Sequence, residues 1–202
     1  MASAVRLFAF LIFAAPAIGC TQTIHPPKDP VGPTRVYVAD YGLHSGIFLP
    51  QRSEGGGYAE DGPYVEYAFG DWSFMALGRT GPLDALSAVF VSQQSALGSR
   101  VVRIEGGRMP PNTAAIPERI NGFYASRADV ERLALALERR HRGRLHTGIR
   151  NLDDETVYVK DLEHYWLGHQ CNHVTLRWLA NLGCDVRGLL PTSHFRLGSF
   201  RQ

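Results

Sequence analysis

The chain has 202 residues, of which 45% are hydrophobic and 20% are charged. The composition is typical of an ordinary globular protein, and the length predicts one domain. With 21 basic and 19 acidic side chains, the formal net charge of +2 is too balanced for a nucleic-acid-binding surface. We therefore expect no nucleic acid as a partner. The one basic cluster ends a predicted helix, where it complements the helix dipole: Arg139, Arg140, Arg142 and Arg144.

Residues 1–19 have the form of a signal peptide. A positive charge at Arg6 precedes an apolar run over residues 7–15, which is too short to span a bilayer comfortably. The run leads to Ala-Ile-Gly-Cys, which resembles the lipobox of bacterial lipoproteins and makes Cys20 the expected lipidation site. Ordinary cleavage after Ala17 is the alternative and would leave Cys20 as a free thiol. Because no aspartate follows Cys20, we expect a lipid-anchored protein on the bacterial outer membrane, facing the periplasm.

Residues 20–34 are rich in proline and polar side chains after the expected anchor, in the stretch TQTIHPPKDPVGPT. This composition predicts a lipid-anchored tether. Residues 35–202 show no internal repeat and no second boundary, so we expect them to form a single α+β domain.

The first half of this domain is predicted to be rich in strands. Strands are expected over Arg35–Asp40, Ser45–Leu49, Tyr64–Phe69 and Arg100–Ile104, because these runs are rich in β-branched and aromatic residues. The glycine-rich residues 51–63 predict a loop between the second and third of these strands. After Pro82, a helix is expected over residues 83–91.

The second half is predicted to contain the two main helices. Ser126 with Asp129 resembles a capping box, and an apolar face follows at helical spacing until Gly143. A strand is expected over Thr156–Lys160 and a last helix over Asn172–Asn181, ending at Gly183. The fold class is therefore predicted to be α+β, a small antiparallel sheet with packed helices. The apolar face of the first helix consists of Val130, Leu133, Ala134 and Leu137.

Cys171 opens the last predicted helix, within HQCNHVTLRWLANLGC. A disulfide with Cys184 is excluded if the helix forms, because thirteen residues at about 1.5 Å each separate the two α-carbons by about 19 Å. A lipidated Cys20 cannot pair either. We therefore expect Cys184 to pack in the core, whereas Cys171 is a buried thiol, a metal ligand or a nucleophile.

A zinc site is the less favoured of these interpretations. Alternating histidine and cysteine ligands suit an extended strand better than the start of a helix, and no second zinc motif accompanies them. We therefore predict no metal and no cofactor. The side chains that enter this hypothesis are His169, Cys171 and His173, with His44, His164 and His194 as further candidates.

Nucleophilic catalysis is the sharper hypothesis for Cys171. The N–H groups and dipole at a helix N-terminus favour a thiolate over the usual thiol pKa of about 8.5, and they can also stabilise an oxyanion. His44, between Gly42 and Gly46, is the candidate base. The group that orients His44 is expected to be Glu66 or Asp71, although Asp71 can instead cap a short helix.

The segments HSGIFLP, YAFGDW and CNHVTLRWLANLGC resemble an uncharacterised bacterial family, a domain of unknown function sometimes encoded near urease genes. More distantly, the order of histidine strand, polar strand residue and cysteine helix is similar to circularly permuted papain-like enzymes. These include the NlpC-type hydrolases and the lecithin:retinol acyltransferase group. The resemblance implies a circularly permuted papain-like arrangement in which His44, Glu66 and Cys171 form the site, and it implies cleavage or transfer at an amide or ester.

Two functions follow as hypotheses. The first is an envelope lipoprotein with Cys/His-dependent hydrolase or transferase activity on a peptidoglycan peptide or a lipid acyl group. In this hypothesis Cys171 attacks, His44 carries the proton, and Tyr41 is a further candidate donor to the oxyanion. The second is a non-catalytic envelope lipoprotein that uses the same fold for binding or as a scaffold.

Overall fold

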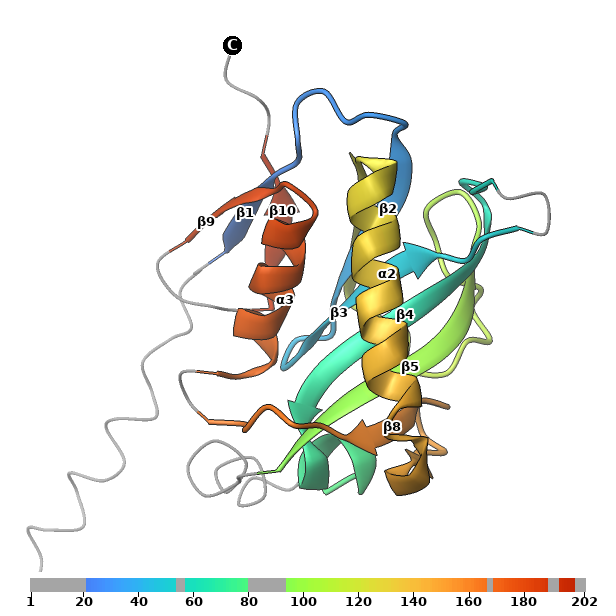
Figure 1. Ribbon diagram of the computed structural model, residues 1–202, viewed down its shortest axis with the longest axis vertical. Coiled ribbons are helices and arrows are strands. Elements are labelled where there is room, and N and C mark those ends of the chain that lie inside the picture. Colours follow the sequence, from blue (N-terminus) through green and yellow to red (C-terminus); the bar gives the residue numbers. More distant parts are fainter. Residues whose placement is uncertain (1–20, 54–56, 80–93, 167–168, 189–192, 199–202) are drawn as a thin grey trace, which may run out of the picture.

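The computed structural model describes residues 21–53, 57–79, 94–166, 169–188 and 193–198. The fold is α+β: seven antiparallel strands form the main sheet, and the helices α2 and α3 pack on one of its faces (Figure 1). The elements in chain order are β1 (Gln22–His25), β2 (Thr34–Asp40), β3 (Ser45–Pro50), β4 (Gly62–Asp71), η1 (Trp72–Ala76), β5 (Ser95–Ile104), β6 (Arg119–Ala125), α2 (Arg127–Arg142), η2 (Leu145–Thr147), β7 (Ile149–Arg150), β8 (Val157–Lys160), α3 (Cys171–Asn181), β9 (Asp185–Arg187) and β10 (Phe195–Leu197).

The main sheet has the strand order β6-β2-β3-β4-β5-β8-β7. The strands β2, β3 and β4, which follow one another in the chain, pair as a meander. Phe48 of β3 lies opposite Tyr37 of β2 and Glu66 of β4. The predicted strands β2, β3 and β8 are confirmed almost to the residue, whereas β4 and β5 are longer than predicted because they form one ten-residue antiparallel ladder. The edge strand β6 was not predicted from the sequence.

Side chains alternate between two faces of this sheet. On the helix face, Ile47, Tyr67 and Phe69 join Val130 and Leu133 of α2 and residues of α3 in the largest core cluster. On the opposite face, which we call the far face, a second cluster contains Phe48, Tyr37 and Tyr64. By the same alternation, Glu66 belongs to the far face.

The two predicted helices are confirmed, but the predicted capping box is wrong. Ser126 does precede α2, yet its side chain makes no cap hydrogen bond to the helix. Its Oγ instead accepts a hydrogen bond from the Val31 N–H at 3.0 Å, which ties the segment before β2 to the start of α2. Gly143 ends α2 and Gly183, with a φ of 81°, follows α3, as predicted. The helix expected over residues 83–91 lies outside the described residues.

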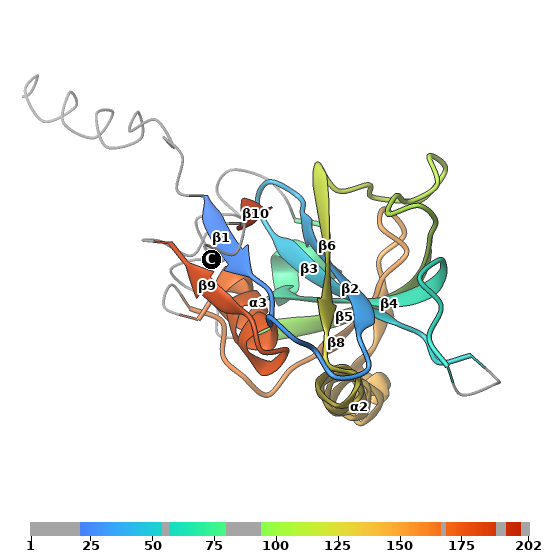
Figure 2. The ribbon, with the colours of Figure 1, turned by 90° about the horizontal axis from the view of Figure 1, so that it is seen from above.

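A second, three-stranded sheet lies beside α3, with β1 between β10 and β9 (Figure 2). Its inner side belongs to the main core, because Ile24 and Phe195 are buried there. The tether predicted over residues 20–34 is therefore wrong for Gln22–His25. The sequence QTIH alternates inward and outward side chains, and two partner strands from the C-terminal part of the chain satisfy its backbone.

Candidate functional site

Cys171 is the first residue of α3, one residue earlier than predicted, and its side chain is only 4% exposed. Gln170 precedes the helix in an extended conformation and makes no side-chain cap, so the first N–H groups of α3 remain open to other partners. The Cys171 thiol lies 3.8 Å from the carbonyl oxygen of Leu43, to which it donates. It also receives hydrogen bonds from the backbone of Ser45 and Asn172 and from the Tyr165 side chain.

A buried hydrogen-bond cluster fixes α3 against β3. The Ser45 hydroxyl lies 3.0 Å from Asn172 Oδ1 and 2.9 Å from Thr175 Oγ1, and all three residues are buried. This contact holds the start of α3 at the β2–β3 turn. The turn residue Gly42 has a φ of 80°, a conformation that side chains other than glycine rarely adopt.

His44 lies in this same turn, but its ring belongs to the far face. The ring stacks on Tyr41, with centroids 4.5 Å apart and planes within 4°. No hydrogen bond joins the His44 ring to Cys171. The structure therefore brings the His44 backbone next to the thiol and directs the imidazole to the opposite face from α3.

A small cavity of about 30 Å³ adjoins the His44 ring on the far face. Burial lowers the pKa of His44 to about 4; Asp154 and Asp40 oppose this effect, and Arg100 adds to it. The imidazole is therefore neutral at neutral pH. The cavity is lined by Tyr41, His44, Glu66, Ala68, Arg100, Ala115, Asp154, Thr156 and Tyr158.

Glu66 lines the cavity with His44 but is occupied by other partners. One carboxylate oxygen accepts from the Tyr41 hydroxyl at 2.6 Å and the other lies 2.5 Å from Arg100 Nε. The remaining Arg100 N–H groups donate to Tyr41 and to backbone carbonyls of two loops. Gly46 makes room for this pair, because a Cβ there would lie 2.7 Å from Glu66 Oε1. The prediction that Glu66 orients His44 is thus not supported by a hydrogen bond between them.

Of the other two predicted site residues, Tyr41 has neighbours that were not expected, whereas Asp71 takes the second of its two predicted roles, as a helix cap. Tyr41 donates to Glu66 and accepts from Arg100, so its hydroxyl is occupied by these partners, and its role in stabilising an oxyanion stays a prediction. Asp71 accepts a hydrogen bond from the Phe74 N–H at 2.8 Å and caps η1. Its charge also acts on Tyr165 and helps to raise the pKa of that hydroxyl.

The predicted thiolate is not present in the resting structure. Burial raises the pKa of Cys171 to about 11, and the donors from Asn172, Ser45 and Tyr165 only partly offset it. The sequence predicted a lowered pKa because it identified the helix N-terminus but not the depth of burial. Cys184 packs in the main core as predicted, and burial raises its pKa to about 12. Both cysteines are free, as predicted.

Two further groups near the site were missed by sequence reasoning, and a third, His194, entered it only as a candidate metal ligand. Tyr165 hydrogen-bonds to the thiol, Asp154 is the carboxylate whose charge acts most strongly on His44, and His194 pairs with Asp40. The His194 Nδ1 lies 2.8 Å from Asp40 Oδ2, and the other Asp40 oxygen accepts from the Gly42 N–H. A carboxylate-oriented imidazole therefore contacts the same turn that carries His44. No spacing or motif in the sequence pointed to this pairing.

The described residues contain no group of three or more histidine, cysteine or acidic side chains that could hold a metal ion. His169 instead lies near Glu163, 2.6 Å between Nε2 and Oε2, and packs on Phe69. None of the described helices is long and apolar enough to cross a membrane.

Comparisons with protein-family models, curated proteins and solved structures give no match for this chain. The protein is an antiparallel α+β domain with a buried cysteine at a helix N-terminus. The family resemblance carried by HSGIFLP, YAFGDW and CNHVTLRWLANLGC stays a prediction.

Proposed function

We propose that this protein is a lipid-anchored envelope enzyme that uses Cys171 as the nucleophile in hydrolysis or transfer of an acyl group. The observation that carries the proposal is the 3.8 Å contact between the Cys171 thiol and the Leu43 carbonyl, one residue before His44. Two sequence segments 127 positions apart thereby meet at one turn, and each brings one member of the pair expected for this chemistry.

The proposed reaction requires a change from the resting arrangement. The imidazole leaves the Tyr41 ring and turns toward the sulfur, where it takes the thiol proton as Cys171 attacks the acyl carbon. The backbone N–H groups of Ser45 and Asn172 that now point at the sulfur then hold the oxyanion. His44 returns the proton to the leaving amine or alcohol. Water or a second acceptor finally takes the acyl group from the thioester.

In this scheme the resting protein is inactive because the Cys171 thiol and the His44 imidazole are apart. The pKa values of about 11 for Cys171 and about 4 for His44 put the proton on sulfur. Moving it to the imidazole while the groups stay apart costs on the order of 10 kcal/mol. Substrate binding at the β2–β3 turn therefore has to bring the two side chains together.

The test is the formation of a thioester on Cys171. The intact protein is incubated with an activated acyl ester, a long-chain acyl thioester or a peptide amide, and the adduct is located by mass spectrometry. Cys184→Ser, which removes the other described thiol, should leave acylation unchanged. Cys171→Ser should abolish it, and His44→Ala should slow it by about 10²–10⁴-fold. His194→Ala reports whether the Asp40-paired imidazole is the base instead.

A non-catalytic binding or scaffold function is the second candidate, favoured by the deep burial and neutral state of the Cys171 thiol. In that case Cys171→Ser should fold normally, and no acyl donor should label the wild-type protein at Cys171. Acylation at Cys171 that needs neither histidine would also contradict the proposed enzyme.

A further inference from the structure

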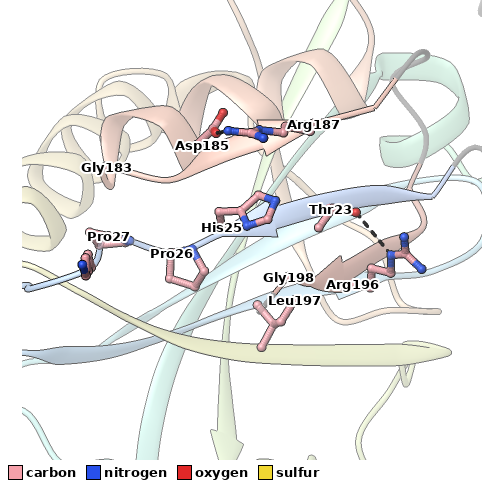
Figure 3. Close-up of a pocket in the computed structure, with 11 residues that line it drawn as sticks. Thr23, His25, Pro26, Pro27, Gly183, Asp185, Arg187, Arg196, Leu197 and Gly198 are labelled. Carbon is pink, nitrogen blue, oxygen red and sulfur yellow. Dashed lines mark hydrogen bonds and ion pairs between the residues drawn. The ribbon is translucent and has the colours of Figure 1, made fainter. Parts of the chain in front are cut away.

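The outer face of the three-stranded sheet carries a row of charged side chains that the proposed reaction does not use. Thr23 of β1 pairs with Arg187 of β9 on one side and with Arg196 of β10 on the other. Ile24 points inward, so these three side chains share the outward face. Figure 3 shows the two arginines on the outer strands with Thr23 between them.

This face forms one wall of a groove of about 810 Å³. Three basic side chains line it, Lys28, Arg187 and Arg196, against the single carboxylate of Asp185. Gly183 and Gly198 also line the groove (Figure 3). The groove is therefore open and basic, in contrast to the balanced charge of the chain.

The hydrogen bonds within the groove leave much of this positive charge available. Arg196 Nε donates to Thr23 Oγ1 at 3.2 Å, and no other interaction of Arg196 occurs within the described residues. Arg187 pairs with Asp185 at 2.7 Å, but its side chain stays 74% exposed. An anion that enters the groove can thus meet two guanidinium groups without breaking a buried contact.

The position of the groove along the chain identifies its occupant. Thr23 follows the expected lipidation site, Cys20, by three residues. At no more than about 3.6 Å per residue, Thr23 at the edge of the groove lies within roughly 11 Å of the anchor. That distance is close to the Debye length of about 8–10 Å over which an anionic membrane surface attracts basic side chains.

We propose that this groove binds the phosphate headgroups of anionic lipids in the leaflet that holds the Cys20 anchor. The proposal rests on the lipid anchoring of the proposed function and goes beyond it. The strand β1 would then lie along the membrane surface and would fix how the domain sits on it.

The test uses the mature protein purified from bacterial membranes, in vesicles of phosphatidylcholine with and without phosphatidylglycerol. Phenylglyoxal modification of each arginine is followed by peptide mass spectrometry. Arg187 and Arg196 should react several-fold more slowly in the phosphatidylglycerol vesicles. Arg132 is the matched control, since it is 71% exposed, also pairs with an aspartate and lies on α2, so its rate should not change.

Equal rates in the two kinds of vesicle, or equal slowing at Arg132, would overturn the proposal. So would equal protection by inorganic phosphate without vesicles, because the site would then bind the free anion.

The intact mass of the purified protein reports separately whether Cys20 carries lipid. If it does not, flotation with phosphatidylglycerol vesicles tests the groove alone. Arg187→Gln with Arg196→Gln should weaken that binding by about 25-fold, roughly fivefold for each arginine, and Arg132→Gln should leave it unchanged. Absence of flotation by the unlipidated wild type would reject the groove itself.

Discussion

The helix face and the far face of the main sheet bury polar groups in different ways. On the helix face, Cys171 sits among neutral donors, and Ser45 bonds to Asn172 at the start of α3. On the far face, Glu66 and Arg100 form a buried ion pair that lines the same cavity as the His44 ring. Neutral hydrogen bonds hold the thiol in place, whereas the His44 ring stacks on Tyr41, whose hydroxyl bonds to Glu66 and Arg100. The comparison suggests that the far face controls the position of His44.

The largest expected effect is loss of the far-face ion pair. Arg100→Met leaves Glu66 buried without a cation and releases the two loops whose carbonyls Arg100 binds. Breaking a buried pair in this way typically destabilises by about 3–5 kcal/mol, measured by urea unfolding. Arg103→Met is the control, because Arg103 pairs with Glu105 in solvent and should change stability by less than about 1 kcal/mol.

A double variant distinguishes the cost of leaving a buried charge unpaired from the cost of lost packing around Glu66 and Arg100. Combining Arg100→Met with Glu66→Leu removes both charges and should recover much of the lost stability. If Arg100→Met alone were as mild as the Arg103 control, the far face would not be held together by charge.

A smaller effect is expected from His44 at acid pH. Its pKa is about 4 in the folded protein against about 6.5 when exposed, so the unfolded chain takes up the proton first as pH falls. The stability contributed by neutral His44 is therefore complete above pH 6.5 and is lost progressively between pH 6.5 and pH 4. The loss should reach up to about 3 kcal/mol.

Chemical unfolding across this pH range, compared between the wild type and His44→Gln, measures that loss. The variant should show a shallower decline in stability, because it lacks the titration of His44. Some decline should remain, since both proteins keep His173, whose pKa is also lowered by burial. Parallel curves for the two proteins would show that the His44 ring is not held in a buried site.

The smallest expected effect is on the helix face. Ser45→Ala removes the hydroxyl that bonds to Asn172 and Thr175 and leaves both partners buried, which should cost about 1–3 kcal/mol in urea unfolding. Ser53→Ala is the control, since its hydroxyl bonds to Gly57 at the surface and its loss should cost less than about 0.5 kcal/mol. Equal costs for the two variants would mean that α3 is positioned by apolar packing alone.

The parts of the fold that depend on local pattern could be predicted from the sequence. The apolar spacing of α2 and the β-rich runs of β2 and β3 are such cases, and so is the placement of Cys171 at a helix start. The strands β1, β9 and β10 could not be, because two of them have only three residues and all are stabilised by partners far along the chain.

The sequence suggests Cys171, His44 and Glu66 as candidate site residues, but it does not predict how they are arranged. The glycines around His44 indicated that backbone or substrate comes close to this turn. At Gly46 the group that comes close is the Glu66 carboxylate. The ionisation state of Cys171 depends on burial, which a single sequence does not reveal. Which face the His44 ring occupies depends on its stacking with Tyr41 and on the network of Arg100, a residue that had been predicted only as part of a strand.

The pH dependence of Cys171 acylation, in the wild type and in His44→Ala, tests most directly whether the two faces cooperate. The second-order rate reports the ionisation of the free protein. With neutral His44 as the base, the wild-type rate should level off above pH 4–5 and stay flat through neutral pH, below the thiol pKa of about 11. His44→Ala should lose this plateau and rise about tenfold per pH unit. Identical profiles that rise steadily in both proteins would contradict the proposed pair.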